Sequence, residues 1–364
     1  MITIQSLKNI ALTTALMPFL AIATAIADEK LDTHEQKNFE TAFLILDQAA
    51  KKIWPGWEKT SRQTWYVSNG YEYYICPEKD FEGFKSLGIN QSIKCEILAR
   101  ETDIKPENVR TVTIGSTPPT IAIASPRRRN KVWMPWIIAW LHEHTHQWQM
   151  SLPDYEEKTR ALNLDSPDDT MGSWMINFNF PYEDLKINAA FDAQRYSLME
   201  LFTAIKQQQA PKRIRMAVKD YLTEKKLFQE VAGEKNYSFA TFQAWQEGTA
   251  RYTEYKILEE TALVAVKNPE MVPIRTIKTL AKYARYKLAE IKKDVETSTL
   301  IANERDAFYA LGAMESLVLD YLVEDWRNQY ADNPYTLDWA FEIWHKNAYQ
   351  KVGDQWQKSN NRND

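Results

Sequence analysis

Apolar residues follow different spacings on the two sides of Pro135. Before it, residues 33–54 carry apolar side chains at helical spacing, and Pro55-Gly56 ends this predicted helix. Three later stretches are short and rich in aromatic and β-branched residues, which is typical of strands. These predicted strands are 71–76, 109–114 and 120–124. Residues 91–100, between the first two strands, are predicted to form a short helix.

From Pro135 onwards the pattern is helical throughout. Pro135 suits the first turn of a helix, and residues 136–149 continue one helical repeat. Six further helices are expected, at 184–208, 211–231, 238–266, 273–296, 299–329 and 336–350. The sequence therefore predicts a predominantly helical α+β protein, in which a small mixed sheet subdomain (28–134) precedes a large helical domain (135–364). A functional site is expected where the two meet.

The first residues have the layout of a secretory signal peptide. Lys8 precedes an apolar stretch, 10–27, which ends in a small-residue pattern before three charged residues. Pro18 inside the stretch and the missing basic flank favour a cleaved signal over a membrane anchor. We therefore expect residues 1–27 to be removed after Ala27. The mature chain would be exported, either periplasmic or secreted, with no stable membrane span.

Composition argues against one class of partner. The 364-residue chain has a net charge of −4, and its acids and bases are interleaved. Because no strongly basic domain is present, nucleic acid is not expected as a partner. The one dense basic run, 127–129, lies in a polar stretch after Pro126, and a solvated loop is the simpler interpretation.

The chain has two cysteines, Cys76 and Cys95. Exported proteins meet an oxidising environment, so a disulfide between them is expected. Two separate buried thiols are the alternative. A pair of cysteines without further Cys or His nearby is poor evidence for a metal site.

The strongest chemical signal is the segment 142–146, His-Glu-His-Thr-His, which fits H-E-x-x-H. Positions four apart on an α-helix lie one turn apart on the same face, so His142 and His146 can aim nitrogens at one metal ion. Zinc is the usual occupant of such a pair. Glu143 lies beside this face, where its carboxylate can reach a water without ligating the metal. That is the position of a general base.

His144 lies two residues from each predicted ligand, and therefore on roughly the opposite side of the helix. Pairing His144 with His146 would suit a strand, whereas the surrounding pattern is helical. We expect His144 to be packed or hydrogen-bonded, without a catalytic task. A helix with ordinary surface histidines is the alternative for the whole motif. Against it, three of the five histidines of the chain fall within these five residues.

A third ligand is needed, because hydrolytic zinc sites use three protein ligands and keep one position for water. The remaining histidines, His34 and His345, are in no recognisable ligand context, so a carboxylate is expected. Glu247 is our preferred ligand. It precedes Gly248 and Ala250, small residues that allow one helix to approach another closely.

Two other acids have weaker claims. Glu200 is the runner-up for the third ligand, although an exposed acid on an amphipathic helix explains it too. Glu254 shares a helix face with Glu247. It either orients a ligand histidine from outside the coordination shell or is solvated, and the spacing favours neither.

The order of these motifs resembles the gluzincins, the thermolysin-like clan of zinc metallopeptidases, in which H-E-x-x-H is followed on a later helix by E-G-x-A. Here the second motif is residues 247–250, Glu-Gly-Thr-Ala. The resemblance implies a zincin-like fold and one Zn²⁺ per chain. The site residues that it implies are the ligands His142, His146 and Glu247 and the base Glu143. It covers the two motifs and their order, and not the full chain.

The resemblance also implies that an edge strand of a small sheet binds extended substrate. The predicted strand 120–124, just before the site helix, is well placed for that role. Two features depart from the clan. About a hundred residues separate His146 from Glu247, so a helical insertion must be accommodated. Arg251 stands where thermolysin-type sites often have an Asp, four residues after the third ligand.

These residues predict a zinc-dependent peptidase acting on a peptide or protein substrate, with Glu143 as general base. Tyr252 and Tyr309 are candidate donors to the oxyanion, although each also suits a core aromatic. Residues 312–316, Gly-Ala-Met-Glu-Ser, are similar to the substrate-amine motif of zinc aminopeptidases. They follow the zinc motif rather than preceding it, so we expect an endopeptidase. The alternative is a non-catalytic zinc-binding or envelope interaction protein with a degenerate peptidase site.

Overall fold

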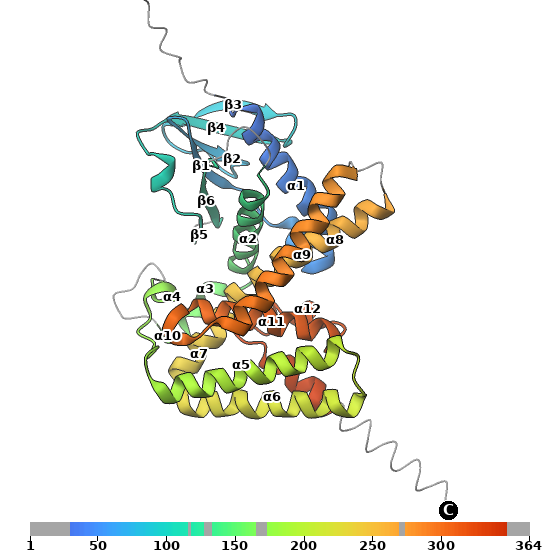
Figure 1. The fold of residues 1–364 in the computed structure, drawn as a ribbon. Coiled ribbons are helices and arrows are strands. Elements are labelled where there is room, and N and C mark those ends of the chain that lie inside the picture. The colour runs from blue at the N-terminus through green and yellow to red at the C-terminus, as the bar shows by residue number, and fades with distance from the viewer. Residues whose placement is uncertain (1–29, 116–117, 127–132, 165–172, 269–273, 348–364) are drawn as a thin grey trace, which may run out of the picture.

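The structure, a computed structural model, describes residues 30–115, 118–126, 133–164, 173–268 and 274–347. The predicted signal peptide and the basic run 127–129 lie outside these residues. The described chain combines a six-stranded mixed sheet on its N-terminal side with a large helical part after it (Figure 1). The predicted α+β class is therefore confirmed. Within the described ranges, no helix combines the length and the apolar character needed to cross a membrane.

The sheet is built from short strands. They are β1 (Thr64–Ser68), β2 (Tyr71–Ile75), β3 (Lys85–Asn90), β4 (Cys95–Glu101), β5 (Val112–Ile114) and β6 (Thr120–Ala124). Their order is β3-β4-β2-β1-β6-β5. Neighbours are antiparallel except β1 and β6, which are parallel. Short 3-10 turns at Trp57–Lys59 and Pro106–Asn108 precede β1 and β5.

Two predictions about this sheet are wrong. Residues 91–100 were expected to be helical, but most of them form β4, which pairs with β2 and β3. Tertiary pairing overrides the local helix propensity here, and the expected disulfide between Cys76 and Cys95 ties the start of β4 to the end of β2. Strand 120–124 was expected at the edge, yet β6 lies between β1 and β5, so β5 is the edge strand on this side.

Helices α1 (Thr33–Ile53) and α2 (Met134–Met150) pack against the sheet. The ring of Phe39 on α1 meets Tyr66 of β1 and Trp136 of α2 edge to face, with centroids 5.2 and 5.0 Å apart. The Trp136 indole donates a 2.8 Å hydrogen bond to the backbone oxygen of Ala124, at the end of β6. These contacts fix α2, which carries H-E-x-x-H, on a rigid support.

The rest of the described chain is helical. Its elements are α3 (Tyr155–Arg160), α4 (Trp174–Asn177), α5 (Leu185–Lys206), α6 (Pro211–Ala232), α7 (Glu234–Gln243), the π-helical turn η3 (Ala244–Gly248), α8 (Thr249–Lys267), α9 (Ile274–Thr297), α10 (Leu300–Asn303), α11 (Asp306–Leu322) and α12 (Trp326–Gln329). Residues 338–347 are also helical. The single helix expected over 299–329 is wrong, because Glu304 (φ 48°) and the extended Val323 interrupt it.

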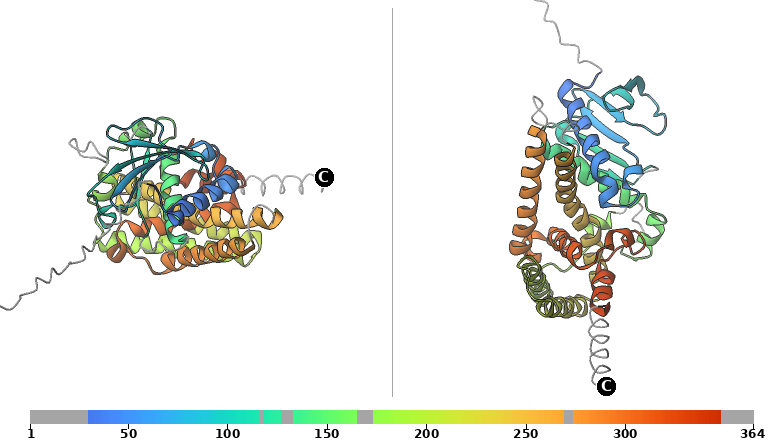
Figure 2. Two further views of the ribbon diagram at one scale, coloured as in Figure 1. Left: turned by 90° about the horizontal axis from the view of Figure 1, so that it is seen from above. Right: turned by 90° about the vertical axis from the view of Figure 1, so that its right-hand side faces the viewer.

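Helix α11 lies at the centre of this helical part, between the α5–α6 pair and the α8–α9 pair (Figures 1 and 2). Every residue from Ala307 to Leu319 is buried. At its crossing with η3, a Cβ on Gly312 would lie 2.1 Å from the Ala244 carbonyl oxygen. A Cβ on Gly248 would lie 2.6 Å from the Gly312 Cα. Only glycine at both positions permits this approach.

Substituting Gly312→Ala should therefore destabilise the protein. The added methyl group overlaps a backbone carbonyl, so η3 and α11 must separate, and the free energy of unfolding should fall by about 1–3 kcal/mol or more. Urea denaturation measures this change. The control is Gly115→Ala, where the new Cβ meets nothing within 4 Å. Equal stability of the two variants would contradict the crossing as described.

Candidate metal centre

Helix α2 brings its two histidines to one point. His142 and His146 lie one turn apart, and their Nε2 atoms are 3.1 Å from each other. The rings are nearly perpendicular, at 82°. Both side chains are largely enclosed by protein.

The third donor comes from η3, about a hundred residues later. Glu247 Oε2 lies 3.4 Å from Nε2 of His142 and 3.3 Å from Nε2 of His146. Two ligands about 2.0–2.1 Å from a tetrahedral ion are separated by about 3.3 Å. The three donor atoms therefore have the mutual spacing of ligands to one ion, and this group could hold a metal.

The π-helical turn sets the direction of Glu247. A π turn contains more residues than an α turn and is frequent at functional sites. Two of its backbone carbonyl oxygens accept hydrogen bonds from neighbouring side chains. The Trp245 oxygen accepts from the Tyr330 hydroxyl at 2.7 Å, and the Gln246 oxygen accepts from Gln149 Nε2 at 3.0 Å. The turn is thus fixed by side chains as well as by the glycine crossing.

Each histidine is held from behind by a hydrogen-bond acceptor. Nδ1 of His142 lies 2.7 Å from Glu254 Oε1, and Nδ1 of His146 lies 2.8 Å from Gln149 Oε1. Because a carboxylate or amide oxygen accepts, each Nδ1 donates, and each Nε2 is the ring nitrogen that can ligate a metal. Of the two interpretations of Glu254, the structure favours the orienting one, since this side chain is only 11% exposed.

Gln149 was missed by the sequence reasoning. Its amide nitrogen faces Thr249 Oγ1 at 3.1 Å and the Tyr330 hydroxyl at 2.8 Å, which turns its oxygen toward His146. The available signal was its position three residues after His146, on the same side of α2. Gln149 thereby links His146 to the π turn that carries Glu247.

Glu143, which follows His142 on α2, is buried, and it is not one of the three residues whose donor atoms lie together. The hydroxyl of Thr113 lies 3.0 Å from its carboxylate and 2.7 Å from its backbone oxygen. Burial lowers the pKa of His146, but the negative charge of Glu247, with a smaller contribution from Glu143, raises it above its usual value. Thr113 belongs to the edge strand β5 and was not singled out from the sequence.

The other predicted residues take different places. His144 packs between the rings of Trp57 and Trp140, at centroid distances of 5.7 and 5.0 Å, as expected for a packed histidine. Burial is the main cause that lowers its pKa to about 3. Glu200 is exposed on α5 and lies 3.8 Å from Arg213. Glu315, within the string 312–316, is buried against Lys225.

The two tyrosines differ. The Tyr252 hydroxyl donates to Asp320 and accepts from Arg327 at 2.7 Å, so it is occupied away from the three donors. Tyr309 is buried on α11. Burial and then the charge of Glu247 raise the pKa of its phenol, which therefore keeps its proton and can donate a hydrogen bond. The structure keeps Tyr309 as a candidate donor.

No protein-family model, curated protein or solved structure matches this chain.

The two candidate third ligands can be separated by substitution. Glu247→Ala should abolish tight metal binding, because it leaves two imidazoles with no carboxylate at ligand distance. Glu200→Ala is the control, and it should bind Zn²⁺ like the wild type. Metal analysis after dialysis against a weak chelator measures both. Zinc retained by Glu247→Ala and lost by Glu200→Ala would reverse the assignment.

Metal binding should release protons. Burial lowers the pKa of His142, but the hydrogen-bonded carboxylates of Glu247 and Glu254 outweigh it and raise this pKa to about 10. The metal-free ring is thus protonated at neutral pH and must lose its proton to ligate, so affinity should rise with pH up to about 10. Calorimetric zinc titrations in buffers of different ionisation enthalpy measure the release. Glu254→Gln should release fewer protons, and a buffer-independent enthalpy for the wild type would contradict the prediction.

Proposed function

We propose that this chain is a zinc-dependent metallopeptidase with a gluzincin-like site. The observation that carries the proposal is the spacing of the three donors, 3.1 to 3.4 Å apart, with the buried acid Glu143 directly after His142 on the same helix. Two imidazoles and one carboxylate form a ligand set typical of hydrolytic zinc. A purely structural zinc site normally has four protein ligands and needs no adjacent base.

The chemistry divides between the ion and the protein. Zinc, when bound, supplies a water of lowered pKa and polarises the scissile carbonyl. Glu143 takes the proton of the attacking water and later passes it to the leaving amine. Thr113 holds Glu143 in place through its hydroxyl. The Tyr309 phenol donates a hydrogen bond to the oxygen on which negative charge develops.

Arg251 stands where thermolysin-type sites often have an Asp, and another acid takes over the role of that Asp in the proposed site. Arg251 pairs with Asp294 at 3.0 Å rather than with a ligand histidine. Glu254, one turn further along α8, takes the orienting role, and its carboxylate reaches His142 at 2.7 Å. A carboxylate behind a zinc-bound histidine fixes the ring and raises its basicity. A carboxylate therefore still orients a ligand histidine, but it comes from position 254 instead of position 251.

An extended peptide would lie along β5 rather than along 120–124. Val112 and Ile114 are exposed on this edge strand, while Thr113 between them points toward Glu143. Adding a strand to an exposed edge supplies backbone hydrogen bonds that do not depend on the peptide sequence. This arrangement supports an endopeptidase that accepts segments within longer chains.

Export completes the proposal. The disulfide between Cys76 and Cys95 suits an oxidising compartment. We infer that residues 1–27 direct the chain there and are cleaved after Ala27.

Glu143→Gln should abolish hydrolysis while leaving the metal bound. The amide preserves the shape of the side chain but cannot accept the proton, so casein cleavage should fall by roughly 10²–10⁴-fold, with one zinc per chain retained. The control is Glu156→Gln, an exposed acid on α3. Undiminished cleavage by Glu143→Gln would remove this base. A wild-type chain that binds zinc and cleaves no peptide would favour the non-catalytic alternative.

A further inference from the structure

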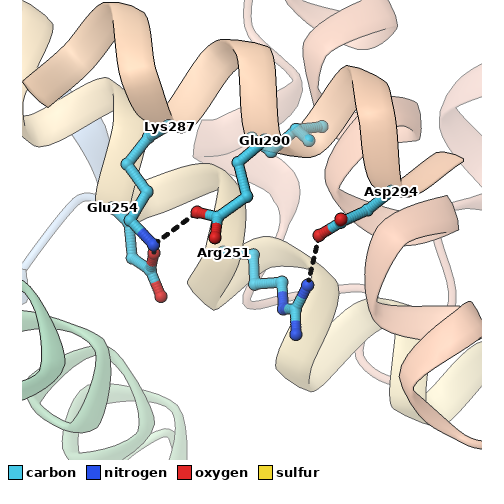
Figure 3. A pocket seen from close by; sticks show the side chains of 6 residues that line it. Arg251, Glu254, Lys287, Glu290 and Asp294 are labelled. Carbon is cyan, nitrogen blue, oxygen red and sulfur yellow. Dashed lines mark hydrogen bonds and ion pairs between the residues drawn. The ribbon is translucent and has the colours of Figure 1, made fainter. Parts of the chain in front are cut away.

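Helix α9 packs along α8, the helix that carries Glu254 (Figures 1 and 2). A pocket of about 100 Å³ lies between the two helices. Glu254, which contacts His142, forms part of its wall. Its lining residues are Arg251, Glu254, Lys287, Glu290, Ile291 and Asp294 (Figure 3).

The two oxygens of Glu254 have different partners. Oε1 lies 2.7 Å from His142 Nδ1, and Oε2 lies 2.7 Å from Lys287 Nζ on α9. The same ammonium group lies 2.7 Å from Glu290 Oε2, one turn further along α9 (Figure 3). A continuous series of charged contacts therefore runs from α9 to a ligand histidine.

Lys287 restricts a side chain that could otherwise turn away. A glutamate has three rotatable bonds, and the pocket beside Glu254 leaves room for other rotamers. Burial lowers the pKa of Lys287, but the negative charges of Glu254 and then Glu290 outweigh this effect. The pKa is raised above its usual value, so the side chain is a cation. A charge-assisted hydrogen bond in this setting is short and directional.

We propose that Lys287 is a positioning residue of the metal centre, which holds the Glu254 carboxylate against Nδ1 of His142. This inference rests on the metal site within the proposed function and does not depend on peptide hydrolysis. Lys287 touches neither the metal nor the substrate, and it acts through Glu254 alone.

Lys287→Met tests the proposal, since it keeps the length of the side chain and removes the charge. The Zn²⁺ dissociation constant should rise by roughly 10–100-fold, as for other residues that orient ligands. The visible absorption spectrum of the Co²⁺-loaded protein should also change, because the His142 ring is free to tilt. Lys287→Arg should restore both properties. If Lys287→Met does not fold, Lys287→Gln provides the same comparison.

Lys256→Met is the matched control. Lys256 is as enclosed as Lys287, with side-chain exposures of 16% and 19%, and it pairs with Glu259 and Asp320 rather than with Glu254. Its loss should leave zinc affinity and the cobalt spectrum unchanged. Wild-type affinity and spectrum in Lys287→Met would overturn the inference, as would equal losses in the two variants. A protein that binds zinc without cleaving peptides overturns the peptidase proposal alone.

Discussion

The candidate metal centre depends on one close contact between backbones. Glu247 can reach the two histidines because η3 crosses α11 at Gly248 and Gly312, where a single added Cβ would overlap main-chain atoms. Helix α2 is fixed separately on the sheet through Trp136. The three donors therefore meet because α2 and η3 are each anchored elsewhere and are joined to each other by Gln149.

Charges around the centre alternate in sign and are mostly enclosed. Isolated charges would not be stable at such burial, whereas paired and hydrogen-bonded ones are. Glu247 lies against the two imidazoles, Glu254 lies between His142 and Lys287, and Gln149 supplies a neutral acceptor for His146. This asymmetry gives His142 and His146 different environments, one supported by a charged carboxylate and the other by an amide.

The sequence predicted local features well and long-range ones poorly. H-E-x-x-H on a helix and the small residues after Glu247 were readable because their spacing encodes a helix face. The strand at 95–101 was mistaken for a helix because its pairing partners lie elsewhere in the chain. Gln149 and Lys287 could not be assigned, since their roles follow from contacts with η3 and with Glu254 that no local pattern records.

The regular helix that follows the π turn at Ala244–Gly248 limits how this chain tolerates insertions and deletions. Removing one of its residues between Glu247 and Glu254 would rotate everything before the deletion by about 100° relative to the rest of α8. A ligand on one side of that point and its orienting partner on the other would then face different directions. The number of residues between Glu247 and Glu254 is therefore constrained, whereas surface loops tolerate changes in length.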